Sequence, residues 1–532
     1  MAFFEKVVDI VDEKAKDLKR RISAVLDDEE FFKYADKMLA LGDEVLSGEY
    51  SKAVLKEIRT KLDTEYTEKL SADGANLVKL LSFLQLRVLL DPNPDMYEDF
   101  LELIRNNQLD VVHIYFLWSQ CRNLQFNMPS VISSKTKVLF MKIYKDIVDE
   151  YEKRVGMDLQ RIPLDERSEK DVIIITSQFV AIAHGPTKSC FFRAKALIQE
   201  GDRKVLIINT NDVLPEHGAI PVYRMAIQST VKKLDNIDTV SDDDVKIPYF
   251  QCEFRMPDPR IIRVLLENIK EIKPKFIINI GGYNITASLA NKLVPVLCVG
   301  MGPSQLQYDY TDFFTYSVKP TEEVYKELES YGGSRDALIP SVFTSDLKEQ
   351  TEQHTRKEYG IPEDKVVLGV IGGRLDMEVN EEFIDFVKDF VDENMKIVFM
   401  GTYRNYDKAC SRDEWFKEHT MYIGFVNDIL SHMELCDIYL NPTRLGGGTS
   451  SVEAMSKGVV PVSLDYGDVA YNVGEEFVDK TYGEMANRIK RLVNDKNYYQ
   501  AMSDKAKARA EYLCDTKHRF IETIHELESR LK

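Results

Sequence analysis

The hydrophobic positions of the first 165 residues recur at intervals of three and four, as in the stretch from Val54 to Leu62. That interval places apolar side chains along one face of a helix. Continuous β-branched runs are few, and turn signals containing Gly or Pro fall at 73–74, 91–94 and 128–129, where helices would end. We therefore predict an all-α N-terminal domain over residues 1–165.

The pattern changes after a charged joint at 164–171. Short, continuous apolar runs then alternate with amphipathic helices, and each run ends near a polar or glycine-containing loop. The runs lie at 172–176, 205–208, 276–280 and 296–299 and, after a second joint near 340–349, at 366–371, 397–400, 438–440 and 459–464. Buried strands that alternate with helices are typical of a parallel sheet covered on both faces.

This repeated pattern predicts two Rossmann-like domains. We place the first at residues 170–340 and the second at 345–500, with a C-terminal helix at 498–532 that packs back across the cleft between them. The predicted fold class is α/β, with two Rossmann-like domains that face a cleft and an all-α domain before them. Because open α/β sheets bind ligands beyond the carboxyl ends of their strands, the loops after the predicted strands are where we expect chemistry.

Composition and charge exclude several kinds of protein. The chain has 532 residues, with 70 Lys and Arg against 88 Asp and Glu, and its formal net charge is −18. A nucleic-acid or anionic-membrane protein relies on broad basic surfaces, so neither partner is expected. The 7 cysteines form no CxxC pair and no zinc-type cluster, and no apolar run reaches the ~20 residues of a membrane span. We expect reduced thiols, no integral membrane span and a cytoplasmic location.

The strongest chemical signal is the stretch from Leu440 to Gly458, where a strand ends, glycines follow and a helix begins. The glycines allow close approach of the backbone, and the free N–H groups at the start of the helix can receive a diphosphate. Glu453, one turn into the helix, is placed to accept hydrogen bonds from ribose hydroxyls. A plain glycine loop with a helix-facing glutamate is the alternative. The predicted nucleotide-binding residues here are Gly447, Gly448, Thr449, Ser450, Ser451 and Glu453.

A second strand of the same domain ends at Gly372-Gly373-Arg374. An arginine at a glycine-flanked strand end can reach a pyrophosphate and neutralise the charge of a departing nucleotide diphosphate without a metal. We therefore predict that Gly373 and Arg374 bind the nucleotide and that Arg374 acts in catalysis by stabilising the leaving group. A surface arginine paired with Asp376 is the alternative.

In the first α/β domain, His184 follows the strand 172–176 and precedes a helix that carries Lys188. An imidazole with an ordinary pKa of about 6.5 can donate to a substrate oxygen or accept a hydroxyl proton, so His184 is the predicted catalytic residue here. Other strand ends of this domain carry glycines and hydrogen-bonding side chains. The predicted acceptor- or sugar-binding residues are Lys188, Asn284, Ser304 and Gln305. For each of these residues a structural or merely exposed role is the alternative.

Other motifs are absent or weak. No GxSxG elbow, P-loop lysine motif or HExxH motif occurs, which argues against the commonest hydrolases, NTPases and metalloproteases. The acidic segment 241–244 resembles the Asp-x-Asp of metal-dependent sugar transferases, but no strong strand precedes it, so we interpret it as a solvated loop. We expect neither a metal nor another cofactor.

Residues 170–530 resemble a GT-B glycosyltransferase, and two branches of that fold contribute features. The segment His184 to Ser189 is similar to the His-Pro-Thr-Ser stretch of O-GlcNAc transferase and of the bacterial cytoplasmic adhesin glucosyltransferases. The segment Gly448 to Glu453 sits like their His-Thr-Thr-Gly-Met-Asp, with Gly448 at the place of the histidine. In that comparison Arg374 replaces the lysine that holds the diphosphate.

The retaining branch of the fold supplies a different resemblance. Glu453-Ala454-Met455 matches its Glu-Ala-Met, although Leu445 stands where that branch has an earlier glutamate. The Arg-Leu after Gly373 also suits that branch. The configuration of the product therefore stays open at this point.

Taken together, the resemblance implies a cytoplasmic, metal-independent glycosyltransferase. It would move a hexose or N-acetylhexosamine from a UDP-sugar to a protein or peptide acceptor, and the helical domain would dock that acceptor or a partner protein. Two alternatives remain. One is a retaining transferase that acts on a glycan or a lipid-linked acceptor, and the other is a catalytically silent GT-B protein that binds carbohydrate or assists a true transferase.

Overall fold

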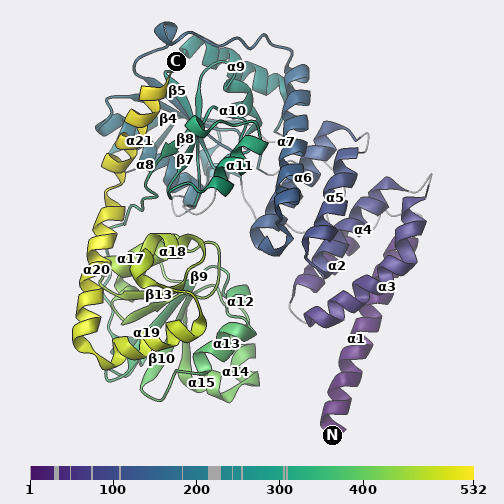
Figure 1. Cartoon of the computed structure of the whole chain (residues 1–532), viewed down its shortest axis with the longest axis vertical. Helices are drawn as coiled ribbons and strands as arrows, with labels where there is room; N and C mark the ends of the chain where they lie inside the picture. Colours follow the sequence, from purple (N-terminus) through teal and green to yellow (C-terminus); the bar gives the residue numbers. More distant parts are fainter. Residues whose placement is uncertain are drawn as a thin grey trace.

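The computed structural model of the chain describes residues 2–28, 35–47, 50–72, 76–106, 109–181, 184–213, 229–242, 244–252, 256–302, 306 and 309–531. Figure 1 shows two α/β domains, one above the other, and beside them a helical arm that carries the N-terminus. Within these residues, no helix is both long enough and apolar enough to cross a membrane.

The N-terminal region is built of α-helices. They are α1 (Ala2–Asp27), α2 (Ala35–Leu46), α3 (Lys52–Ser71), α4 (Leu77–Leu90), α5 (Pro94–Asn106), α6 (Val111–Asn127) and α7 (Ser134–Val155), with a 3-10 turn at Pro129–Val131. Side chains cap their starts: Asp110 accepts a hydrogen bond from the first turn of α6, and Ser133 forms a reciprocal capping box with Thr136 of α7. Helix α7 ends at Gly156, whose φ of 59° only glycine adopts easily.

The first α/β domain holds an eight-stranded sheet. Its strands are β1 (Asp171–Thr176), β2 (Lys204–Asn209), β3 (Thr239–Asp242), β4 (Val245–Gln251), β5 (Phe276–Ile280), β6 (Val296–Val299), β7 (Phe313–Tyr316) and β8 (Leu338–Pro340), in the order β3-β4-β2-β1-β5-β6-β7-β8. All neighbours pair in parallel except β3, which is antiparallel to β4. The associated helices are α8 (Gly185–Gln199), α9 (Pro259–Ile272), α10 (Ile285–Ala290) and α11 (Glu322–Ser330), with 3-10 turns at Leu164–Glu166, Lys232–Leu234 and Arg335–Ala337.

The second α/β domain holds a six-stranded parallel sheet in the order β11-β10-β9-β12-β13-β14. Its strands are β9 (Val366–Gly372), β10 (Met395–Gly401), β11 (Thr420–Gly424), β12 (Ile438–Leu440), β13 (Val460–Leu464) and β14 (Val478–Asp479). Its helices are α12 (Leu375–Glu378), α13 (Glu381–Lys388), α14 (Tyr406–Arg412), α15 (Glu414–His419), α16 (Ile429–Met433), α17 (Gly448–Ser456), α18 (Gly467–Val473) and α19 (Tyr482–Asn494), with 3-10 turns at Arg356–Tyr359 and Glu475–Phe477. The predicted mixed α/β class with two parallel sheets after a helical region is confirmed.

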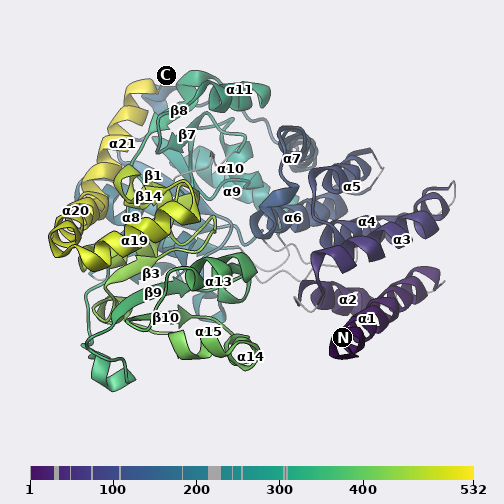
Figure 2. The same cartoon turned by 60° about the horizontal axis from the view of Figure 1, so that its bottom comes forward.

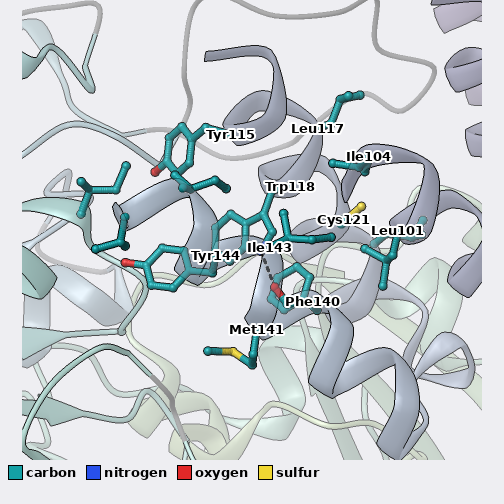
Figure 3. Close-up of a cluster of buried hydrophobic side chains, with 14 of the residues drawn as sticks. Leu101, Ile104, Tyr115, Leu117, Trp118, Cys121, Phe140, Met141, Ile143 and Tyr144 are labelled. Atoms are coloured by element: carbon teal, nitrogen blue, oxygen red, sulfur yellow. Dashed lines mark hydrogen bonds between the residues drawn. The ribbon is translucent and has the colours of Figure 1, made fainter. Parts of the chain in front are cut away.

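An aromatic cluster joins the helical region to the first α/β domain. The indole of Trp118 stacks on Phe140 and Tyr144, with ring centroids 4.7 and 4.9 Å apart, and its Nε1 donates a hydrogen bond to the carbonyl of Phe140 (Figure 3). Tyr283, just after β5, meets the edge of the same indole at 5.1 Å. Buried aromatic surface therefore holds the helical region against the first sheet.

The C-terminal segment forms two helices rather than the single one that the pattern predicts. Helix α20 (Lys496–Cys514) contacts α17 and β13 of the second domain, and α21 (Thr516–Arg530) contacts α8 and β8 of the first. In Figures 1 and 2 they run along one side of both domains. The break at Asp515, whose ψ of 57° is not helical, lets each helix pack on its own domain.

The acidic segment 241–244 is solvated at Ser241 and Asp244, which are exposed, but differs from the expected loop at Asp242; Asp243 lies outside the described residues. Ser241 and Asp242 belong to β3, and the carboxylate of Asp242 forms an ion pair with Lys195 of α8 at 2.6 Å. Both side chains are largely buried. The interpretation as a loop was wrong because a short edge strand has too few residues to show a period of two.

Candidate functional site

The glycine-rich loop after β12 leads directly into α17, as the sequence predicts. Gly447 precedes the helix with a φ of 97°, and no side chain caps the helix start. The hydroxyls of Ser450 and Ser451 donate to the carbonyls of Gly447 and Gly448 at 2.8 and 2.7 Å, so these hydroxyls are already engaged. The first backbone N–H groups of a helix have no intrahelical partner, and such an uncapped helix start can receive an anion.

Glycine is required at the start of α17 because both sides of the loop are filled. A Cβ on Gly447 would lie 2.7 Å from Nε of Arg444, and one on Gly448 would lie 2.6 Å from Nδ2 of Asn472. Asn472 is buried, and within the described residues its side-chain amide has no hydrogen-bond partner. This packing explains why a side chain such as histidine is absent at position 448.

Arg374 lies against the same loop although it comes from the end of β9. A Cβ on Gly446 would lie 3.5 Å from Nη2 of Arg374. The guanidinium pairs with Glu378 at 3.4 Å, not with Asp376, whose carboxylate accepts hydrogen bonds from two backbone N–H groups further along the chain. Gly373 has open space where a Cβ would point. The alternative of an arginine paired with Asp376 is therefore wrong.

Arg444 is a residue of this site that sequence reasoning missed. Its buried guanidinium donates to Asn441 Oδ1 at 2.8 Å, to the carbonyl of Ile371 at 2.6 Å and to Tyr439 Oη at 2.7 Å, and it pairs with Glu378 at 2.9 Å. Glu378 therefore lies between two arginines. Arg444 binds the glycine-rich loop to β9, and no local pattern distinguishes such an arginine from an exposed one.

Glu453 has an unusually high pKa for a glutamate. Burial raises its pKa to about 7, against the opposing effect of the cations Lys188 and Lys348. Lys188 belongs to α8 of the first domain, so the predicted sugar-side lysine and the predicted ribose-side glutamate influence each other across the two domains. Within the described residues, the carboxylate has no hydrogen bond or ion pair of its own, and its acceptor oxygens are available to a ligand.

His184 occupies the residue position just before α8. Its ring is half-buried, Nδ1 lies 3.5 Å from the hydroxyl of Thr187, and burial lowers the pKa of the imidazole. The neutral ring can therefore accept a proton near neutral pH.

Three post-strand loops of the first domain meet at Met301. A Cβ on Gly185 would lie 3.6 Å from its Cε, and one on Gly281 would lie 3.5 Å from its Cγ. The loops after β1, β5 and β6 thus gather at one edge of the sheet, as the topology requires. Sequence analysis did not identify Met301 as a site residue, because only the glycines on either side of it are typical of a ligand-binding loop.

The two domains touch beside this site. A Cβ on Gly302 would lie 2.7 Å from Oδ1 of Asp468 in α18, and the backbone N–H of Asp468 donates to the carbonyl of Leu445 at 2.7 Å. The β6 loop of the first domain therefore lies against the glycine-rich loop of the second. Asp468 was not predicted, since nothing in its local sequence points to the other domain.

Asn284 lies inside the first domain, which differs from the predicted acceptor-facing position. Its side chain is fully buried, with Nδ2 3.0 Å from Ser177 Oγ and 2.7 Å from Thr210 Oγ1, and its Oδ1 caps α10. Its hydrogen-bonding groups are used within the fold. The other two predicted residues of this group, Ser304 and Gln305, lie outside the described residues.

Helix α6 of the helical region contacts both α/β domains. Arg122 donates to the carbonyl of Gly281 at 3.3 Å in the first domain. One turn later, the ring of Phe126 lies 5.0 Å from the guanidinium carbon of Arg374 in the second. The helical region therefore borders the site directly. Among the described residues, no cluster of three or more His, Cys, Asp or Glu side chains could hold a metal ion.

Comparisons with known proteins agree with this arrangement. Residues 351–509, which include Arg374, the glycine-rich loop and Glu453, match the sequence model of the family described as glycosyl transferases group 1. No curated protein matches the sequence significantly.

Two solved structures share the fold. An O-GlcNAc transferase mutant from Thermobaculum terrenum aligns with a TM-score of 0.53 and 12% identity, covering 96% of this chain and 97% of its own. A glycosyltransferase from Rickettsia africae aligns with a TM-score of 0.50 and 11% identity, covering 69% of this chain and 100% of its own. The predicted GT-B architecture is confirmed, and the family match in the second domain supports a nucleotide-sugar-dependent glycosyltransferase.

Proposed function

We propose that the protein transfers a hexose or N-acetylhexosamine from a UDP-sugar to a protein or peptide acceptor without a metal ion. One observation carries this proposal: the uncapped start of α17, the guanidinium of Arg374 and the carboxylate of Glu453 border a single loop and helix. Amide N–H groups and a guanidinium bind phosphates, and a carboxylate binds the hydroxyls of a ribose. A nucleoside diphosphate offers both kinds of partner.

The proposed reaction begins when an acceptor hydroxyl attacks the anomeric carbon of the donor sugar. The new carbon–oxygen bond forms while the bond to the β-phosphate oxygen breaks, and UDP leaves with the electron pair of that bond. The N–H groups of α17 and the guanidinium of Arg374 stabilise the charge that develops on the leaving phosphate. The proton of the acceptor passes to the imidazole of His184, which burial keeps neutral near neutral pH.

The position of the helical region supports a protein or peptide acceptor. Because Phe126 of α6 touches Arg374, an acceptor held on the helical region would be next to the donor phosphate. Lys188, whose charge acts on Glu453, is the proposed contact to the sugar. The O-GlcNAc transferase that shares the fold makes N-acetylglucosamine one donor to test first. A cytoplasmic location belongs to the same proposal.

A donor screen tests this function. Purified protein is incubated with individual UDP-sugars, with and without a panel of acceptor peptides, and released UDP and peptide mass are measured. We expect one UDP-sugar to give UDP release and a peptide mass increase of one sugar residue. Peptides that stay unmodified, with UDP release accelerated by a glycan or a lipid-linked sugar, would contradict the peptide acceptor.

A retaining reaction on a glycan or lipid-linked acceptor is a second candidate, favoured by the Glu453-Ala454-Met455 sequence within α17. Nuclear magnetic resonance of the product distinguishes the two candidates. An anomeric configuration equal to that of the donor means retention, and the opposite configuration means inversion.

A catalytically silent protein is the third candidate, because Glu378 lies against both Arg374 and Arg444 and offsets positive charge beside the loop. A rise in melting temperature with UDP shows that the folded protein binds the nucleotide. UDP binding without turnover of any donor would favour this candidate over an enzyme, and no shift with any nucleotide would contradict the donor site itself.

A further inference from the structure

A polar pocket lies where α8, α21 and the connection between the two α/β domains meet. Part of it is open to solvent. Its polar lining consists of Arg193, Thr315, Ser317, Ser341, Thr344, Thr516 and Thr523. None of the residues from Leu440 to Glu453 lines it, so its lining differs from that of the proposed nucleotide site, although Gly302 of the β6 loop, which lies against the glycine-rich loop, also lines the pocket.

Arg193 brings an uncompensated positive charge to the pocket. Its Nη1 donates to the carbonyl of Ser189 at 3.4 Å, its guanidinium lies over the ring of Phe520 at 5.3 Å, and its buried Nε has no hydrogen-bond partner within the described residues. No carboxylate among the described residues lies within ion-pair distance of it. Burial lowers the pKa of this guanidinium to about 10, which still leaves it protonated near neutral pH.

Two buried arginines of the chain show the usual arrangement, whereas Arg193 is half-buried. Arg444 pairs with Glu378 at 2.9 Å, and Arg87 pairs with Asp63 at 2.6 Å. Lys195, two residues after Arg193 on α8, is likewise neutralised by Asp242 at 2.6 Å. A buried charge costs free energy unless it is paired, so an arginine that faces a pocket without a carboxylate favours an anionic ligand.

Hydroxyl groups complete the lining. The hydroxyls of Ser317 and Ser341 lie 3.1 Å apart, and one of the two can donate to the other. Ser317 also hydrogen-bonds with Tyr471, and the hydroxyls of Thr315, Thr516 and Thr523 donate to backbone carbonyls, so most hydroxyls of the lining already have partners. The guanidinium of Arg193, whose Nε has no partner within the described residues, is therefore the donor that matches the oxygens of a phosphate group better than a neutral ligand.

Both passages of the chain between the two α/β domains line the pocket. The first passage follows β8 and contributes Ser341 and Thr344. The second passes through Asp515 between α20 and α21, and Thr516, the first residue of α21, lines the pocket. Tyr471 of α18, in the second domain, hydrogen-bonds with Ser317 and with the backbone of Phe343. A ligand in this pocket would therefore contact the segments on which the relative position of the domains depends.

We propose that this pocket is a second anion-binding site, which takes a phosphate group and which is distinct from the nucleotide site at α17. The phosphate can come from free inorganic phosphate or from a sugar monophosphate, because both present the same oxygens to Arg193. This proposal does not depend on the transferase reaction, since it concerns a different set of residues.

Binding of inorganic phosphate and of a hexose phosphate to the full chain tests the site. We measure affinity by calorimetry and locate the ligand by hydrogen exchange. We expect millimolar or tighter binding, with slower exchange in peptides covering 341–344 and 516–523. Tighter binding of the hexose phosphate than of inorganic phosphate identifies the sugar phosphate as the source, and equal binding identifies the phosphate alone.

Variants separate this site from the nucleotide site. Arg193→Met should weaken phosphate at least tenfold, because it removes a charge-assisted donor, and Arg193→Lys should keep part of the affinity. Ser341→Ala, a milder change, should weaken phosphate with no loss of fold. The matched control is Arg263→Met, which removes an exposed arginine paired with Glu267. Phosphate that fails to bind, that binds Arg193→Met unchanged, or that slows exchange only at 446–451 would overturn the proposal.

Discussion

At the scale of single residues, two arginines meet one carboxylate and have different tasks. The side chain of Arg444 is 3% exposed, and its guanidinium donates hydrogen bonds to Asn441, to the carbonyl of Ile371 and to Tyr439. The side chain of Arg374 is 34% exposed, and its guanidinium lies 3.4 Å from the carboxylate of Glu378. A side chain that is partly exposed and weakly paired can turn toward a ligand. Arg374 is therefore the proposed phosphate ligand, and Arg444 maintains the loop beside it.

Replacing Arg374 by Ala should lower kcat/KM for the UDP-sugar about a hundredfold, since loss of a group that stabilises the leaving phosphate costs ~3 kcal/mol of transition-state binding. Initial rates of sugar transfer measure this effect. Arg263→Ala serves as the control because Arg263 is exposed. An Arg374→Ala protein that transfers sugar at the parental rate would show that another group stabilises UDP.

Arg444→Ala should act on stability instead. It leaves the buried carboxylate of Glu378 without its closest partner, and breaking a buried pair in this way costs about 3–5 kcal/mol. Urea unfolding followed by circular dichroism measures the loss. A variant as stable as the parent would mean that Arg374 or water replaces Arg444 beside Glu378.

The raised pKa of Glu453 predicts that the affinity for UDP depends on pH. Its folded-state pKa is about 7, above the ordinary value of 4.5, so the carboxylate that accepts ribose hydrogen bonds forms only as the pH rises through about 7. UDP should bind more tightly at pH 8 than at pH 6, and Glu453→Gln should bind weakly at both values. Calorimetric titrations at the two pH values measure this, and a flat profile in the parent would contradict the assigned role.

The same shift predicts the opposite trend for stability. Because the folded state holds a proton that the unfolded state releases near pH 4.5, the contribution of Glu453 to stability is present below that pH and is lost as the pH rises through about 7. At pH 8 the Glu453→Gln protein should therefore have a higher melting temperature than the parent. The same substitution should also weaken UDP binding. A stabilised variant with unchanged UDP affinity would indicate a purely structural glutamate.

At the scale of elements, the start of α17 is defined by what surrounds it. The helix begins without a side-chain cap, and its two flanking glycines are enclosed by Arg444 on one side and Asn472 on the other. The backbone N–H groups are thus presented by an element whose position is fixed by packing. A helix end held in this way does not have to reorganise when an anion binds.

Gly448→Ala tests this packing. The new Cβ would lie 2.6 Å from Nδ2 of the buried Asn472, so the neighbours must shift, and we expect a loss of about 1–3 kcal/mol in the free energy of unfolding. Gly373→Ala is the matched control for stability, since nothing lies within 4 Å of its Cβ position. Denaturant midpoints compare the two variants, and equal midpoints would show that the α18 side has room for a side chain.

At the scale of the whole molecule, the helical region and the C-terminal helices hold the two α/β domains from different directions. Helix α6 touches the first domain through Arg122 and the second through Phe126, while α20 and α21 pack on one domain each. The side chain of Phe126 is 59% exposed, and its ring lies over the guanidinium of Arg374. Its contact with Arg374 links the helical region to the proposed leaving-group site.

Phe126→Ala should weaken UDP binding about two- to fivefold, because an exposed cation–π contact contributes about 0.5–1 kcal/mol to the position of Arg374. Phe126→Tyr keeps the aromatic face and should restore the parental affinity. Calorimetric titration of UDP with both variants measures this. If alanine and tyrosine behave alike, the ring does not position Arg374.

Local sequence accounts for much of the site. The glycine run before a helix, the arginine after β9 and the glutamate one turn into α17 each follow a strand, and parallel strands bring their carboxyl ends to one edge. That rule is sufficient to place Arg374 near the glycine-rich loop. The rule does not predict that the side chain of Asn284 turns into the domain and hydrogen-bonds with Ser177 and Thr210. A side chain after a strand end can point inward or toward the cleft, and the sequence is the same in both cases.

The sequence by itself determined the helical region, the two parallel sheets and the loops that carry the proposed chemistry, because these depend on periodicity and on backbone groups a few residues apart. Only the tertiary structure decided that Arg374 pairs with Glu378, that Asp468 meets Gly302 and that Lys188 acts on Glu453. In the last two of these pairs the two residues come from different domains. In the first pair, the packing around Arg444 places Glu378 beside Arg374, although Asp376 is closer in the sequence. Such choices depend on which surfaces are brought together in three dimensions, and spacing along the chain does not contain that information.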